Sequence, residues 1–77
     1  MAVSYKPLWV ELAKRDLRKK DIQVMAKLTS NLLANMGKNE YISMRNLEKI
    51  CKALNCTPND VIEFYWKDGL LVERYIF

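Results

Sequence analysis

Residues 21–36 read DIQVMAKLTSNLLANM and contain two short segments joined by a tight turn. In each segment apolar residues recur at spacings of three and four, which place them on one face of a helix. These residues are Ile22, Met25 and Ala26 in the first segment, and Leu32, Leu33 and Met36 in the second. We therefore expect two short helices that each bury one face. This is the pattern of a helix-turn-helix motif.

The turn contains a residue suited to begin the second helix. The hydroxyl of Thr29 can accept a hydrogen bond from a free backbone N–H in the first turn of that helix, which predicts a start near Ser30. The outward face would then carry small, uncharged side chains, two of them amides: Ser30, Asn31, Ala34 and Asn35. Such a face suits the edges of DNA base pairs.

Residues 4–63 resemble the small helix-turn-helix regulators related to phage repressors, the XRE or Cro type. Two positions depart from the family pattern. Gln23 stands where a small residue is usual, and Lys27 stands where the turn usually has glycine. A left-handed lysine would cost on the order of 1 kcal/mol relative to glycine. The apolar positions of the motif all match: Ile22, Ala26, Leu28, Leu33 and Met36.

Longer stretches of sequence look like one subgroup of compact family members. These stretches are SYKPLW, LTSNLLANMGKNEYIS, LEKICKALNC and TPNDVIE. The resemblance implies sequence-specific binding of double-stranded DNA, with the second helix in the major groove. It implies base reading by Ser30, Asn31 and Asn35, and a thymine-methyl contact by Leu32. It also implies phosphate contacts by Lys19, Lys20, Thr29, Lys38, Asn39, Tyr41 and Arg45. For Tyr41, packing against the core fits equally well.

The charges of the chain are segregated. The 77 residues have a net charge of +4, but residues 1–52 hold eleven Lys or Arg against five acids, and residues 53–77 hold two against four. The basic part, at +6, contains the expected reading helix, which favours a surface that faces phosphate. Arg18, Lys19 and Lys20 precede the first helix of the motif. These cations could bind a DNA phosphate at the N-terminus of that helix. A run of charged side chains that only faces water explains the same residues equally well.

Composition excludes several other classes of function. With 51% apolar and 29% charged residues and no long apolar run, the chain reads as a soluble, cytoplasmic domain without a membrane segment or signal peptide. It has no histidine and two glycines, so neither a catalytic base of that type nor a phosphate loop is available, and we expect no enzyme, cofactor or small-molecule ligand. Cys51 and Cys56 alone are too few for zinc. Cys51 is expected to be a small core residue on a helix, and Cys56 to lie just past the end of that helix.

Three further helices are predicted around the motif. They span about 6–15, 44–54 and 58–65, and Ser43 and Thr57 are the expected N-caps of the last two. Gly37 is expected to cap the reading helix at its C-terminal end, and Asn55 to end the fourth helix. The residues expected to face inward are Leu8, Trp9, Leu12, Ala13 and Leu17, then Met44, Leu47, Ile50, Cys51 and Leu54, then Val61, Ile62 and Tyr65.

The predicted fold is therefore mainly α, a compact five-helix domain like that of phage repressors with a C-terminal strand. Residues 1–65 would form the DNA-binding domain, and residues 66–77 an arm. In that arm Leu70, Leu71, Val72, Tyr75, Ile76 and Phe77 need a partner. Residues 1–5, which are rich in strand formers, are one candidate, and the arm of a second copy is the second candidate. An arm folded back onto the first helix of its own chain would also bury these residues and leave a monomer. The second candidate would give a homodimer on a palindromic operator, bound by a transcriptional repressor or activator.

A different class of function also fits the sequence. The same helical scaffold could hold a protein partner, for instance as the antitoxin half of a toxin–antitoxin pair, and the apolar arm favours this alternative. RNA binding fits less well, because the reading face lacks the aromatic residues on which bases stack. DNA binding should weaken strongly with salt, whereas protein association should not.

Overall fold

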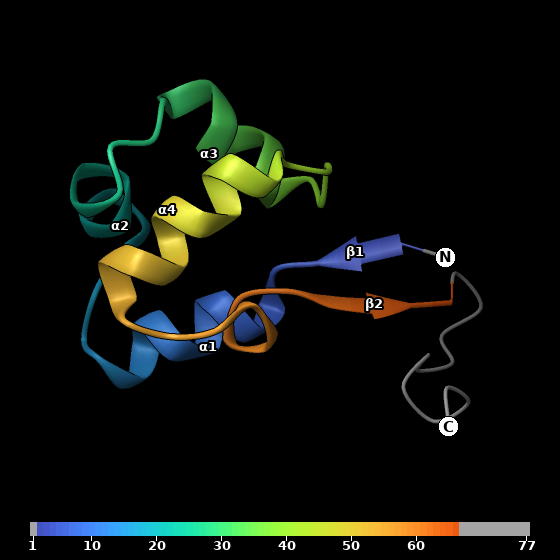
Figure 1. Ribbon diagram of the computed structural model, residues 1–77, viewed down its shortest axis with the longest axis horizontal. Helices are drawn as coiled ribbons and strands as arrows, with labels where there is room; N and C mark the ends of the chain where they lie inside the picture. Colours follow the sequence, from blue (N-terminus) through green and yellow to red (C-terminus); the bar gives the residue numbers. More distant parts are fainter. Residues whose placement is uncertain (1, 67–77) are drawn as a thin grey trace.

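The computed structural model describes residues 2–66, which form a helical body with a small sheet at one end (Figure 1). In chain order the elements are β1 (Ala2–Ser4), α1 (Lys6–Lys14), α2 (Lys19–Met25), α3 (Ser30–Gly37), α4 (Met44–Leu54), the 3-10 helix η1 (Pro58–Asp60) and β2 (Glu63–Tyr65). The mainly helical class predicted from the sequence is confirmed. The expected arm, residues 66–77, lies outside the described residues except for Trp66.

One core joins the helices and the sheet. α4 packs against α2 and η1, and α1 packs against η1. Burying these apolar side chains stabilises the domain by about 25 cal/mol for each Å² removed from water. The buried residues are Val3, Tyr5, Leu8, Leu12, Ile22, Ala26, Leu28, Met36, Leu47, Ile50, Leu54 and Val61.

Three residues expected to face inward are exposed instead. Met25 is 46% exposed at the last residue of α2, and Met44 is 78% exposed at the first residue of α4. Ala13 is exposed near the end of α1. At a helix terminus the i, i+3, i+4 spacing still places a residue on the apolar stripe, but no neighbouring element extends far enough to cover it. The prediction was therefore wrong at these three positions.

Helix starts follow the predicted capping residues. Thr29 Oγ1 accepts from the backbone N–H of Leu32 at 3.0 Å, and Ser43 Oγ accepts from that of Asn46 at 3.1 Å. α2 begins at Lys19, two residues earlier than Asp21, because the Asp21 carboxylate accepts from the backbone N–H of Arg18 at 2.8 Å. Lys19 and Lys20 thus belong to the first turn of α2 rather than to a preceding segment.

The end of α3 differs from the prediction. Gly37 is the last helical residue, and a Cβ placed there would meet nothing within 4 Å. The left-handed residue after the helix is Asn39, with φ 59°, and its N–H donates to the Met36 carbonyl at 3.0 Å. Asparagine tolerates this conformation better than most residues, so it takes the place that the sequence assigned to glycine. Asn55 ends α4 in the same left-handed conformation, as predicted.

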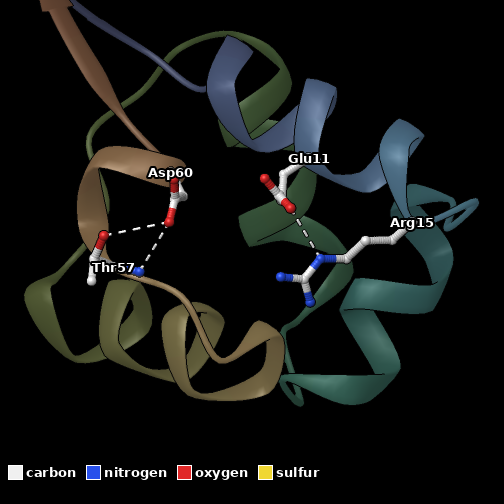
Figure 2. Close-up of polar contacts among 4 residues, drawn as sticks. All are labelled: Glu11, Arg15, Thr57 and Asp60. Carbon is white, nitrogen blue, oxygen red and sulfur yellow. Dashed lines mark hydrogen bonds and ion pairs between the residues drawn. The ribbon is translucent and has the colours of Figure 1, made fainter.

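The predicted fifth helix over 58–65 is wrong. Its start is correct, since the Asp60 carboxylate accepts from the Thr57 backbone N–H at 3.3 Å (Figure 2), but the helix stops at Asp60. The chain then becomes β2, which pairs antiparallel with β1 in the register Ala2↔Tyr65, Val3↔Phe64 and Ser4↔Glu63. The β-branched and aromatic residues of 61–65 favour a strand once a partner strand lies beside them. The N-terminal residues therefore pair with β2.

α1 has an ion pair along its own length and a cation–π contact to α2. Arg15 Nε lies 3.1 Å from Glu11 Oε2 along the helix (Figure 2). Lys19 Nζ lies 4.4 Å from the ring centroid of Trp9, so a cation–π contact joins α1 to the first turn of α2. Trp9 is half-buried against the core, as its place on the apolar stripe predicted. α1 ends at Lys14, and Asp16, two residues later, is left-handed with φ 58°.

Candidate nucleic-acid interface

The turn between α2 and α3 has the geometry of a tight helix-turn-helix. Lys27 is left-handed with φ 56°, and the Leu28 N–H donates to the Gln23 carbonyl at 2.9 Å. Lys27 thus adopts the conformation that glycine would adopt more readily, and its side chain is exposed. Leu28 turns inward and is buried, which fixes the angle at which the chain enters α3.

α3 exposes a face without charge. Ser30, Asn31 and Ala34 are exposed, and Asn35 is half-buried. The opposite side of the helix carries Met36, which is fully buried in the core. Hydroxyl and amide groups can each donate and accept, so this face can bond to the donors and acceptors of base edges without desolvating an ion.

Leu32 and Leu33 flank this face. Both are partly buried and pack against the core. Leu32 was predicted to touch a thymine methyl, and the partial burial of its side chain leaves a smaller apolar surface for that contact. Thr29 is exposed, and its hydroxyl caps α3.

A loop held to the core follows α3. The N–H groups of Lys38 and Glu40 both donate to the Asn35 carbonyl at 3.0 Å. The hydroxyl of Tyr5, a fully buried side chain, donates to the Glu40 carbonyl from the start of α1. Burial raises the pKa of this Tyr5 hydroxyl, so it remains a donor at neutral pH. The loop is thereby fixed beside the exposed face of α3.

Cationic side chains are more numerous than acids around the motif. Residues 18–45 contain six Lys or Arg against two acids, Asp21 and Glu40. All of the residues predicted to bind phosphate are exposed: Lys19, Lys20, Thr29, Lys38, Asn39, Tyr41 and Arg45. Tyr41 is 70% exposed, so it is not a core residue. The Lys19 ammonium lies over Trp9, which fixes its position at the start of α2.

The sequence predicts no role for Gln23, although this residue departs from the family pattern. In the structure Gln23 Nε2 donates to Ser30 Oγ at 3.1 Å, so the two helices of the motif are joined at the first residue of α3. The signal for this contact was present, since a long amide replaces a small residue at the point where α2 faces the start of α3. Only the three-dimensional arrangement identifies its partner.

Two other kinds of site have no support in the described part of the chain. Residues 2–66 contain no cluster of three or more side chains that could ligate a metal, and no helix there is long and apolar enough to cross a membrane. Cys51 and Cys56 are half-buried beside the core, and burial raises the pKa of both thiols. They are therefore protonated at neutral pH.

Known proteins resemble this chain over most of its length. Residues 7–67 match the family described as Cro/C1-type HTH DNA-binding domain. An uncharacterized HTH-type transcriptional regulator of Bacillus subtilis (strain 168), YozG, is 39% identical over 57 residues, which cover 71% of this chain and 68% of that protein. The crystal structure of the transcriptional regulator VanUg, form II, aligns with a TM-score of 0.78 at 39% identity and covers 80% of this chain and 83% of that one. The chain therefore belongs to the Cro/C1-type helix-turn-helix family and is a sequence-specific DNA-binding regulator of transcription.

Proposed function

We propose that α3 enters the major groove of an operator, with Ser30, Asn31 and Asn35 facing the base edges. The observation that carries this proposal is the charge-free exposed face of α3, which exposed lysines precede in the chain at Lys27 and follow at Lys38. An asparagine can bond to N6 and N7 of adenine in bidentate fashion, so Asn31 and Asn35 are the residues that discriminate most. Leu32 adds a contact to a thymine methyl through the exposed part of its side chain.

Residues on both sides of α3 hold the phosphates in this proposal. In the chain, the first turn of α2 and the cap of α3 precede the reading face, and the loop after α3 and the start of α4 follow it. Contacts from two sides fix the orientation of α3 in the groove without reading sequence. The phosphate ligands are Lys19, Lys20, Thr29, Lys38, Asn39, Tyr41 and Arg45.

The regulator acts in the cytoplasm as a homodimer on a palindromic operator. One reading helix recognises few base pairs, whereas two placed about 34 Å apart read both halves of a palindrome. The dimer contact is assigned to residues 66–77, and residues 1–65 form the reading domain. In an extended segment Leu70, Val72 and Ile76 lie on one face and Leu71, Tyr75 and Phe77 on the other. A strand with apolar side chains on both faces needs both faces covered. In this proposal its own domain covers one face and the second subunit covers the other.

The surface that would receive this arm lies between the sheet and the start of α4. A cavity of about 160 Å³ is lined there by apolar and aromatic side chains, among them Tyr5, Leu47 and Ile62. Two large apolar side chains outside the set of phosphate ligands are exposed around it, Met44 (78%) and Phe64 (45%). A surface of this kind marks an interaction site, and the arm of a second copy has the matching chemistry.

Alanine variants separate base reading from phosphate binding. Asn31→Ala and Asn35→Ala should each lose roughly 1–3 kcal/mol of discrimination at one or two base pairs, because the bidentate contact to the base is removed. Lys38→Ala should weaken binding to all duplexes alike and reduce the slope of log K against log salt by about one unit. Fluorescence anisotropy with operator and random duplexes measures both effects. Equal losses on both duplexes for the asparagine variants would remove those residues from the reading role.

A further inference from the structure

The hydrogen bond between Gln23 and Ser30 fixes the direction in which the Ser30 hydroxyl can bond. Gln23 lies in the middle of α2, and Ser30 is the first residue of α3. The Gln23 amide nitrogen donates to Ser30 Oγ at 3.1 Å, and the hydrogen bonds of residues 2–66 give the Ser30 hydroxyl no other partner. The amide NH₂ group has no lone pair to offer, so in this contact the hydroxyl oxygen is the acceptor.

This contact changes what Ser30 offers to a third group. A free serine hydroxyl has one proton to donate and two lone pairs with which to accept. The Gln23 amide uses one lone pair and leaves the proton unbonded. Accepting a hydrogen bond also polarises the O–H bond and strengthens it as a donor. Ser30 is thereby biased towards donation, and its proton is directed away from α2.

We propose that Gln23 is a specificity-determining residue that positions Ser30 as a hydrogen-bond donor to the operator. This inference rests on the proposed placement of α3 in the major groove. There guanine offers N7 and O6, adenine offers N7 and thymine offers O4 as acceptors, whereas cytosine offers only its N4 amino group as a donor. At the base that faces Ser30, Gln23 therefore favours guanine and disfavours cytosine. Gln23 acts through Ser30 and touches no base itself.

The test compares two duplexes that differ at one base pair. An operator is first selected from random DNA with the unaltered protein. The base pair that faces Ser30 is then the one at which Ser30→Ala no longer prefers one base over another. The measured quantity is the ratio of affinities for duplexes with guanine or cytosine on the strand that faces Ser30. The unaltered protein should favour guanine by roughly tenfold, the worth of one hydrogen bond gained against one lost.

Gln23→Glu should abolish or reverse this ratio. An ionised carboxylate can only accept hydrogen bonds, so in this variant the Ser30 hydroxyl donates its hydrogen bond to the introduced carboxylate and keeps lone pairs that can accept from the cytosine amino group. The added negative charge weakens binding to both duplexes and cancels in the ratio. Val24→Glu is the matched control, because it adds the same charge to α2 at a side chain that is 73% exposed. This variant should weaken binding to both duplexes and leave the ratio of the two affinities unchanged.

A double-mutant cycle shows whether Gln23 acts through the hydroxyl. In the Ser30→Ala background, Gln23→Glu should leave the ratio unchanged, because the group on which it acts is gone. The inference would be overturned if Gln23→Glu left the guanine-to-cytosine affinity ratio unaltered while Ser30→Ala abolished it. It would also be overturned if Gln23→Glu shifted this ratio equally in proteins with and without the Ser30 hydroxyl. A selection that yields no preferred duplex would instead refute the proposed placement of α3, and the inference with it.

Discussion

Ile50→Asp should unfold the domain. Ile50 is fully buried at the centre of α4, which packs against α2 and η1. The substitution removes a large apolar side chain and places an ionisable group without a partner in the core. That change costs several kcal/mol, comparable with the whole stability of a domain of this size. The far-UV circular dichroism spectrum should lose its helical minima.

Met44→Asp is the matched control on the same helix. Met44 is 78% exposed at the first residue of α4, so the same carboxylate there stays hydrated and lies favourably near the helix N-terminus. This variant should keep the helical spectrum. A native spectrum for Ile50→Asp, or loss of structure in both variants, would contradict the assigned burial of α4.

Removal of the arm should convert a dimer into a monomer. In sedimentation at tens of micromolar, we expect the full chain to be a dimer and a chain that ends at Tyr65 to be a monomer. Both should show the same helical signal per mole of chain, because the described helices and the core cluster of the described residues all lie before Trp66. Affinity for a palindromic operator should fall by about 100-fold or more in the shortened chain, since the second half-site is no longer bound intramolecularly. Affinity for a single half-site should change little.

Met44→Lys tests the surface that is proposed to receive the arm. The side chain is exposed, so the domain should fold, but a charge beside the cavity should oppose docking of an apolar segment. The full-length variant should sediment as a monomer. A full-length wild-type monomer at tens of micromolar would refute the dimer. A dimer that survives removal of the arm would move the contact to another surface.

Local features of the fold could be predicted because the interacting groups lie close together in sequence. Thr29 and Ser43 each bond to an N–H three residues ahead, so a short sequence window contains both the hydroxyl and its partner. The apolar stripes of α1, α2 and α4 were likewise readable from spacing. Their end residues Met25 and Met44 were not, because coverage at a helix end depends on the next element.

The features that were missed depend on partners distant in sequence. Residues 63–65 form a strand because residues 2–4 lie beside them, roughly sixty positions earlier in the chain. Without that partner, the cap at Thr57 and Pro58 favours a helix that continues. The contact of Gln23 with Ser30 spans the turn of the motif, and the turn geometry at Lys27 sets the distance between the two side chains. Sequence spacing alone does not determine that distance.

The central claim is that this chain reads DNA sequence with α3. The most direct measurement is selection of bound duplexes from a random pool, followed by titration of the selected duplex and of a scrambled duplex of the same composition. We expect a palindromic consensus, an affinity about 10³-fold or more above that for the scrambled duplex, and a steep loss of affinity between roughly 50 and 200 mM salt. Equal affinity for the two duplexes, or a selected pool without a consensus, would contradict the claim.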